Sequence, residues 1–326
     1  MKKISLLSVL VPAYNEEECL ETFYKQLCGV LDTLKCDTEV LIVNDGSKDR
    51  TIEIIRELQT IDCRISYLDL SRNYGKEIAM AAGIDFVKGD ALVIIDADLQ
   101  DPPALISEML KEIEEGEYDD VYAKRFSRKG ETRLKRFTSI IYYRILKLMS
   151  SIPIQVDTGD FRMFSEKAIK ALRELKESKR NMKGLFSYIG FKKKALYYER
   201  CPRVAGSTKW NYFKLFNLAV KGLTSFSTTP LRVVSLMGIL ISLAAFIYLL
   251  VVFIQALMFG NPVHGYPSLM SVMLFLGGIQ LLSLGILGEY IGIIYSETKK
   301  RPNYFINEYS CKTKETGILE QLIGKM

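Results

Sequence analysis

The chain of 326 residues is 48% hydrophobic and 25% charged, and its formal net charge is +6 at pH 7. This composition is typical of a folded protein and excludes a disordered or low-complexity chain, while the length favours one large domain or two smaller ones. His264 is the only histidine and the six cysteines show no CxxC spacing, which argues against a zinc site or a Cys/His nucleophile.

Strands and helices alternate through the first 95 residues. Apolar runs rich in β-branched residues predict strands over residues 5–12, 40–43, 65–70 and 91–95. Apolar residues at helical spacing predict helices over 16–34, 51–59 and 76–87. This alternation is typical of an open α/β sheet, which binds its ligands beyond the carboxyl ends of the strands. Polar clusters at residues 14–17, 44–47, 72–76 and 96–98 each follow a predicted strand.

The last of these clusters has the pattern of a metal site. If the backbone stays extended after the strand, Asp96, Asp98 and Gln100 point to one face. Two carboxylates and an amide oxygen suit Mg²⁺ or Mn²⁺ that is shared with substrate phosphates. Asp-x-Asp alone more often marks a solvated turn, but its position after a buried strand favours the metal interpretation.

Positive charge is concentrated between residues 121 and 150, where nine basic residues and one acidic residue give +8. Helical spacing places Arg133, Arg136, Arg144 and Lys147 on one stripe beside an apolar stripe, which predicts an interfacial amphipathic helix over about 133–150. Residues 211–226 repeat this pattern. The alternatives are a core helix with a solvated face and a nucleic-acid surface, although the neighbouring apolar stripe favours lipid over nucleic acid.

Residues 233–288 contain no Asp, Glu, Lys or Arg, which is enough apolar chain for two membrane spans. We expect residues 229–298 to form a two-span region and residues 299–326 a cytoplasmic tail. Arg232, Lys299, Lys300 and Arg301 flank the spans, whereas the turn between them has no Lys or Arg, so both termini and the head should be cytoplasmic. Glycines 277, 278, 285, 288 and 292 form a small-residue face that suits helix packing, within the chain or in a homo-oligomer.

Six motifs occur in order along the chain: VPAYNEEE, VNDGSKDRT, SRNYGKEIAMAAG, DADLQDPP, DTGDFRMFS and GEYIGIIYSETKKRP. Together they resemble the polyprenyl-phosphate glycosyltransferases, family-2 GT-A enzymes that include dolichyl-phosphate mannose synthases and bactoprenol glucosyltransferases. The resemblance implies a Rossmann-like GT-A catalytic domain over residues 1–228. It also implies metal-dependent, inverting transfer of one sugar from a nucleotide sugar to a membrane polyprenyl phosphate. DTGDFR is closest to the bactoprenol branch, which implies UDP-glucose and undecaprenyl phosphate at the plasma membrane, for cell-envelope glycosylation; N-acetylglucosamine, galactose and mannose donors remain alternatives.

The same resemblance implies roles for individual residues. The expected donor-binding residues are Pro12, Tyr14, Glu16, Asp45, Lys76, Asp96 and Asp98, and the expected metal ligands are Asp96, Asp98 and Gln100. Asp157 is the expected catalytic base or orienting carboxylate, acting with Asp98 and Gln100; Asp160 could be confused with it, and Arg162 is expected to pair with one of the two aspartates. The acceptor phosphate is expected at Arg125, Arg133, Arg136, Arg203 and Lys209.

Simpler interpretations of two donor residues stay open, since Glu16 could cap a helix and Lys76 could be an exposed helix-end lysine. A processive polysaccharide synthase is disfavoured because two spans cannot enclose a polymer channel. A membrane-tethered binding or scaffold protein with a decayed site is disfavoured by Asp96, Asp98 and Lys76.

Overall fold

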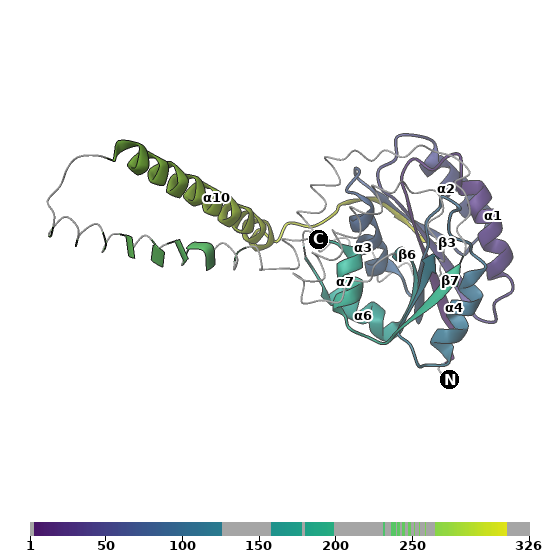
Figure 1. Cartoon of the computed structure of the whole chain (residues 1–326). Coiled ribbons are helices and arrows are strands. Elements are labelled where there is room, and N and C mark those ends of the chain that lie inside the picture. The colour runs from purple at the N-terminus through teal and green to yellow at the C-terminus, as the bar shows by residue number, and fades with distance from the viewer. Residues whose placement is uncertain are drawn as a thin grey trace. The chain divides into compact units, whose positions relative to one another are not determined.

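A computed structural model describes residues 3–125, 158–177, 180–198 and 265–311, together with isolated helical positions between residues 231 and 258 (Figure 1). The chain divides into two compact units. Among the described residues, 3–125, 158–198 and 301–311 belong to the first unit, with a two-residue gap at 178–179, and those from 231 to 300 belong to the second.

An eight-stranded sheet with the order β7-β5-β6-β4-β1-β2-β3-β8 is the centre of the first unit. Its strands are β1 (Leu6–Ala13), β2 (Asp37–Asn44), β3 (Ile65–Leu70), β4 (Ala91–Ile94), β5 (Asp120–Arg125), β6 (Thr158–Ser165), β7 (Lys193–Tyr198) and β8 (Ile306–Ser310). Strands β4, β1, β2 and β3 are parallel neighbours, whereas β6 and β8 run antiparallel to the strands beside them. The predicted open α/β sheet and its first four strands are therefore confirmed.

Helices cover both faces of this sheet (Figure 1). Helices α1 (Leu20–Leu31), α2 (Thr51–Ile61) and α4 (Leu105–Glu114) contribute to one continuous apolar core. Helices α3 (Lys76–Phe86), α6 (Glu166–Glu174) and α7 (Met182–Tyr188) cover the other face. Helix α3 packs so tightly that a Cβ on Gly83 would lie 2.1 Å from Leu10 Cδ1, so glycine is needed there.

Helix α1 illustrates how the sequence produces this packing. Its buried side chains, Leu20, Phe23, Tyr24, Leu27 and Leu31, recur every three or four residues and form one apolar stripe against the sheet. The helix begins at Leu20 rather than at residue 16, because residues 17–19 form a turn. Glu16 precedes this turn, and its backbone carbonyl accepts the N–H groups of Cys19 and Leu20, both at 3.0 Å, so a capping role for Glu16 stays open.

The second unit contains one long described helix, α10 (Tyr266–Thr298). Within the described residues, its segment Phe275–Thr298 is the one helix long and apolar enough to cross a membrane. The predicted first span is described only at isolated helical positions, and both predicted interfacial helices, 133–150 and 211–226, lie outside the described residues.

The segment after α10 differs from the tail that we expected for residues 299–326. Residues Ile306–Ser310 form β8, an edge strand of the sheet, which pairs with β3 and belongs to the first unit. The segment reads INEYS and has no continuous apolar run of the kind that predicted the other strands.

Candidate functional site

The carboxyl ends of the parallel strands carry the predicted donor residues. Ala13 of β1, Asn44 of β2 and Asp69 of β3 are register partners, so the loops that follow them begin at the same edge of the sheet. Pro12 is buried within β1, whereas Tyr14 just beyond the strand is 38% exposed. This edge is where an open α/β sheet binds its ligands.

Lys76, Asp96 and Asp160 form the central charged group of this edge. The Nζ atom of Lys76 lies 2.7 Å from Oδ2 of Asp96 and 2.6 Å from Oδ2 of Asp160. Lys76 is the first residue of α3, Asp96 follows β4, and Asp160 belongs to β6. The three residues come from separate parts of the chain, and the fold brings them into contact.

Electrostatics favour the charged forms of Lys76 and Asp160. Burial acts to lower the pKa of Lys76, but the charges of Asp96 and Asp160 outweigh it and raise that pKa above its ordinary value. Burial acts to raise the pKa of Asp160, but Lys76, then Lys183, outweigh it and lower that pKa. Lys76 is thus a partly exposed lysine at the start of a helix, as the simpler interpretation had it, but it is also paired with two carboxylates.

The backbone after β4 does not continue as the sequence predicted. The strand ends at Ile94 and a turn follows, in which Leu99 adopts a left-handed conformation with φ of 58°. The Oδ1 atom of Asp98 accepts a hydrogen bond from the backbone N–H of Gln100, at 3.1 Å. The prediction of extended backbone from Asp96 to Gln100 is therefore wrong, because residues 97–99 form a turn and a bend.

The residues of this turn nevertheless fit a shared divalent cation. In the described part of the chain, no group of three or more His, Cys, Asp or Glu side chains is arranged to hold a metal alone. Asp96 and Asp98 supply two carboxylates, and Oε1 of the buried Gln100 has no hydrogen-bond partner among the described residues. Such an incomplete oxygen set is what Mg²⁺ or Mn²⁺ uses when substrate phosphates supply the remaining ligands.

Asp45 holds the loop that leads to Lys76. Its carboxylate accepts the backbone N–H groups of Tyr74 at 2.7 Å and Gly75 at 2.9 Å, and its side chain is almost fully buried. Burial raises the pKa of Asp45, and these two N–H groups partly oppose the rise. Gly46 has φ of 63°, and a Cβ there would lie 2.4 Å from the backbone carbon of Arg72, so glycine allows the two loops to touch.

The loop after β1 is fastened to the loop after β2. The backbone N–H of Asn15 donates to Ser47 Oγ at 3.0 Å, and the N–H of Glu16 donates to Thr51 Oγ1 at 2.9 Å. Asn15 has φ of 54°, a left-handed conformation that asparagine tolerates better than most residues. Ser47 thus holds the loop after β1 against the loop after β2.

Arg162 pairs with a different aspartate from the one expected. Its Nη1 lies 3.2 Å from Oδ2 of Asp120 in the sheet interior, and both side chains are almost completely buried. Phe186 packs against the guanidinium, 4.4 Å from the ring centroid. Among the described residues Arg162 thus pairs with Asp120 and not with Asp160, whereas Asp157 lies outside the described residues.

Several predicted residues lie outside the described part of the chain. These are the candidate base Asp157 and the acceptor-side residues Arg133, Arg136, Arg203 and Lys209. Arg125 ends β5, but its side chain is also outside the described residues. Sequence reasoning missed the contact of Asp160 with Lys76; its signal was the second acidic position in the DTGDF motif.

Comparison with known proteins identifies the class of protein that this sheet and site define. The model of glycosyl transferase family 2 matches residues 8–173, and the model of the GtrB C-terminal hairpin matches residues 229–294. The chain belongs to glycosyl transferase family 2. The resemblance drawn from the six motifs, the mixed α/β GT-A architecture and the assignment as a glycosyltransferase are thereby confirmed.

Individual relatives narrow the comparison. An uncharacterized glycosyltransferase, sll0501, of Synechocystis is 47% identical over 93% of this chain and 95% of its own length. The bactoprenol glucosyl transferase of Shigella phage SfV is 43% identical over 94% of this chain and 99% of its own. Among solved structures, glucosyl-3-phosphoglycerate synthase from Mycobacterium tuberculosis, in complex with Mn²⁺, uridine diphosphate and phosphoglyceric acid, is 17% identical, with a TM-score of 0.46 over 68% of this chain and 76% of that one.

Proposed function

We propose that this glycosyltransferase moves one glucosyl group from UDP-glucose to the phosphate of a membrane polyprenyl phosphate, with inversion at the anomeric carbon. Undecaprenyl phosphate is the proposed acceptor. The observation that carries the proposal is the 43% identity to a bactoprenol glucosyl transferase across 94% of this chain and 99% of that protein. Similarity along both full lengths includes the catalytic domain and the hairpin region, and both are needed to bring a soluble donor to a lipid acceptor.

The acceptor chemistry requires little proton transfer. The second pKa of a phosphate monoester is about 6, so the lipid phosphate is mostly a dianion at neutral pH. Its oxygen attacks the anomeric carbon from the face opposite the nucleotide, and the bond from that carbon to the UDP oxygen breaks. The products are glucosyl phospholipid and UDP, without removal of a proton from the nucleophile. Asp157 is therefore proposed to orient the acceptor more than to act as a strong base.

The donor side is assigned to the strand-end loops of the described structure. Tyr14, Glu16 and Asp45 are proposed to bind the nucleoside, with Pro12 shaping the floor of that site. Lys76 is proposed to neutralise diphosphate charge, and its ion pairs with Asp96 and Asp160 support this role because they hold the ammonium at the ligand-binding edge. Asp160 is a positioning residue for Lys76 in this proposal.

Asp96, Asp98 and Gln100 are the residues proposed to hold a divalent cation together with the donor. When bound, Mg²⁺ or Mn²⁺ supplies Lewis-acid stabilisation of the negative charge that develops on the leaving diphosphate. The carboxylates and the unpartnered buried oxygen of Gln100 support this assignment.

The acceptor side and the membrane attachment rest on the sequence. Arg125, Arg133, Arg136, Arg203 and Lys209 are proposed to recruit the lipid phosphate, beside the amphipathic segments 133–150 and 211–226. Two spans within residues 229–298 are proposed to anchor the enzyme in the plasma membrane, with the head and both termini cytoplasmic and the glycine face available for homo-oligomer packing. The match to a hairpin model over residues 229–294 supports two spans.

A donor panel tests this function. Full-length enzyme in detergent is incubated with undecaprenyl phosphate, Mn²⁺ or Mg²⁺, and UDP-glucose, UDP-N-acetylglucosamine, UDP-galactose or GDP-mannose. We expect UDP-glucose to give the highest kcat/KM and mass spectrometry to find one hexose on each lipid. A higher kcat/KM for another donor would reassign the sugar, and products with several hexoses would favour a processive synthase.

A further inference from the structure

Strand β8 brings a residue from beyond α10 to the ligand-binding edge of the sheet. Ala13, Asn44, Asp69 and Glu308 are successive register partners across β1, β2, β3 and β8. Asn307 directly precedes Glu308. The backbone of Asn307 therefore lies beside the strand ends that precede the donor loops. A segment separated from β3 by the whole membrane region thus completes this edge.

Side-chain hydrogen bonds connect β8 to those loops. The amide of Asn307 donates to Oδ2 of Asp69 at 2.8 Å, and the amide of Asn44 donates to Oδ1 of the same carboxylate at 2.7 Å. Asp69 and Asn44 are both buried. Loss of one such hydrogen bond would leave a buried carboxylate oxygen unsatisfied, which costs free energy. The amides of Asn307 and Asn44 therefore hold Asp69 in place between them.

The connection continues to the first two loops of the edge. The side-chain oxygen Oδ1 of Asn44 accepts the backbone N–H of Ser47 at 3.3 Å, and Ser47 Oγ accepts the N–H of Asn15 at 3.0 Å. Asn15 stands between the proposed donor residues Tyr14 and Glu16. A chain of hydrogen bonds therefore runs from Asn307 through Asp69, Asn44 and Ser47 to the loop after β1.

The same segment also holds the third loop. The carbonyl of Phe305 accepts the backbone N–H of Ser71 at 3.0 Å, and residues 71–75 then reach Asp45 through the N–H groups of Tyr74 and Gly75. All three loops of the proposed nucleoside site are thus hydrogen-bonded, directly or through a buried neighbour, to residues 305–307.

We infer that Asn307 is a positioning residue of the donor site, which acts through Asp69 and Asn44 on the loops that carry Tyr14, Glu16 and Asp45. This inference rests on the proposed donor site at that edge. The segment that follows the membrane region then belongs to the catalytic domain in function as well as in structure. The affinity of the catalytic domain for the nucleotide depends on this segment.

Strand β8 has other anchors, so the role of Asn307 can be separated from the presence of the strand. Glu308 contacts Tyr67 at 2.7 Å and also Arg56, and Ser310 Oγ donates to Gln59 Oε1 at 3.0 Å. Ser310 pairs with Tyr67, at the end of β8 away from the donor loops. Ser310→Ala therefore removes a side-chain hydrogen bond to a neutral amide oxygen from the same strand, away from the donor loops, and is the control for Asn307→Ala.

The experiment compares full-length wild type, Asn307→Ala and Ser310→Ala in detergent by UDP calorimetry with Mn²⁺, steady-state kinetics and amide hydrogen exchange. Loss of one hydrogen bond to a buried carboxylate should raise the UDP Kd and the UDP-glucose KM about three- to tenfold, with kcat and the acceptor KM nearly unchanged. Exchange in the peptides that contain residues 14–16 and 45–48 should accelerate in Asn307→Ala, while β1 and β2 stay protected. Ser310→Ala should match wild type in all of these.

Two results would overturn the inference: unchanged exchange and UDP affinity in Asn307→Ala, or the same losses in Ser310→Ala, which would indicate a general loosening of β8. Failure of wild type to bind UDP would instead contradict the proposed donor. The exchange measurement would still test the role of Asn307 in that case, because it requires no ligand.

Discussion

Lys76 and Asp160 form an ion pair with an Nζ–Oδ2 distance of 2.6 Å, which joins the start of α3 to β6. Asp160 has a side chain only 13% exposed, and its other oxygen, Oδ1, has no hydrogen-bond partner among the described residues. A carboxylate in this position directs the ammonium toward the strand ends instead of leaving it in solvent. The second aspartate of the motif DTGDF, Asp160, therefore holds Lys76, the residue proposed to bind the donor diphosphate.

Replacement of Lys76 should affect the use of the donor more than the use of the acceptor. Lys76→Met removes a charged donor of hydrogen bonds worth about 1.5–3 kcal/mol each, so kcat/KM for UDP-glucose should fall by about 10- to 100-fold. Asp160→Asn should have a smaller effect, because Asp96 still holds Lys76. Lys170→Met, which removes an exposed pair with Glu166 on α6, is the control. Equal activity of Lys76→Met and Lys170→Met would contradict a role of Lys76 in the site.

Arg136 is predicted to act on the acceptor. Because Arg136 belongs to the basic stripe predicted for segment 133–150, Arg136→Ala should raise the apparent KM for polyprenyl phosphate and leave the KM for UDP-glucose nearly unchanged. Steady-state kinetics with each substrate varied in turn separates the two constants. The opposite pattern would place Arg136 in the donor site.

The role of Asp157 is tested by pH. General bases typically contribute about 10²- to 10⁴-fold where a proton must be removed, and an ionised phosphate should need the lower end of that range. The loss in Asp157→Asn should shrink as pH rises through the acceptor's second pKa of about 6. The measurement is a pH–rate profile of both proteins at saturating donor. A large loss that does not change with pH would show that Asp157 holds the sugar or the metal instead.

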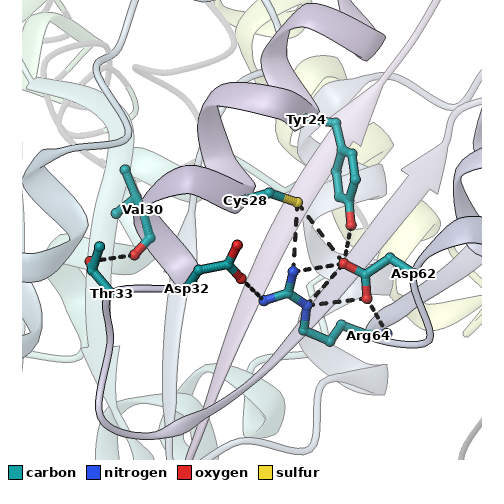
Figure 2. A network of polar contacts seen from close by, with 7 residues as sticks. All are labelled: Tyr24, Cys28, Val30, Asp32, Thr33, Asp62 and Arg64. Atoms are coloured by element: carbon teal, nitrogen blue, oxygen red, sulfur yellow. Dashed lines mark hydrogen bonds and ion pairs between the residues drawn. The ribbon is translucent and has the colours of Figure 1, made fainter.

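A polar network around Asp62 predicts that the folded protein loses stability in acid. Arg64 contacts Asp62 through Nε at 2.9 Å and Nη2 at 2.7 Å, and Asp32 through Nη1 at 2.8 Å, while Tyr24 donates to Asp62 (Figure 2). Burial acts to raise the pKa of Asp62, but hydrogen bonds from Arg64 and Tyr24 outweigh it and lower the pKa to about 2 from 3.8. This lowering stabilises the fold fully above pH 3.8 and is lost as pH falls through 2.

Arg64→Met should therefore lower the free energy of unfolding at pH 7 by about 1–2 kcal/mol. Its difference from wild type should narrow between pH 4 and pH 2, where Asp62 becomes protonated in both proteins, as expected from a lowered pKa of about 2. Thermal melts of the two proteins in detergent measure this. Arg56→Met removes a more exposed arginine and is the control, and a pH-independent difference in Arg64→Met would indicate lost packing rather than a lost charge interaction.

The sequence predicted the parts of the fold that local patterns encode. The strands β1 to β4 and the placement of Asp45, Lys76 and Asp96 at their carboxyl ends follow from continuous apolar runs that end in polar residues. These patterns have short range, and neighbouring residues are enough to recognise them.

Contacts between distant segments could not be predicted in this way. The pairing of β8 with β3 and the pairing of Arg162 with Asp120 depend on topology that no local pattern specifies. The turn at Leu99 was missed for another reason, because leucine with positive φ has no sequence signal of the kind that glycine provides. Extended geometry was therefore assumed where the chain turns.

The most direct test of the whole account is the rate of glucosyl transfer by Asp98→Asn beside wild type, each with Mn²⁺ and with a chelator. Asp98 lies in the turn after β4, so the variant should insert into the membrane, bind detergent and melt like wild type. The account predicts that Asp98→Asn forms almost no glucosyl phospholipid, that the chelator abolishes wild-type transfer, and that Mn²⁺ restores wild type only. Full activity in Asp98→Asn, or undiminished wild-type transfer in the chelator, would contradict it.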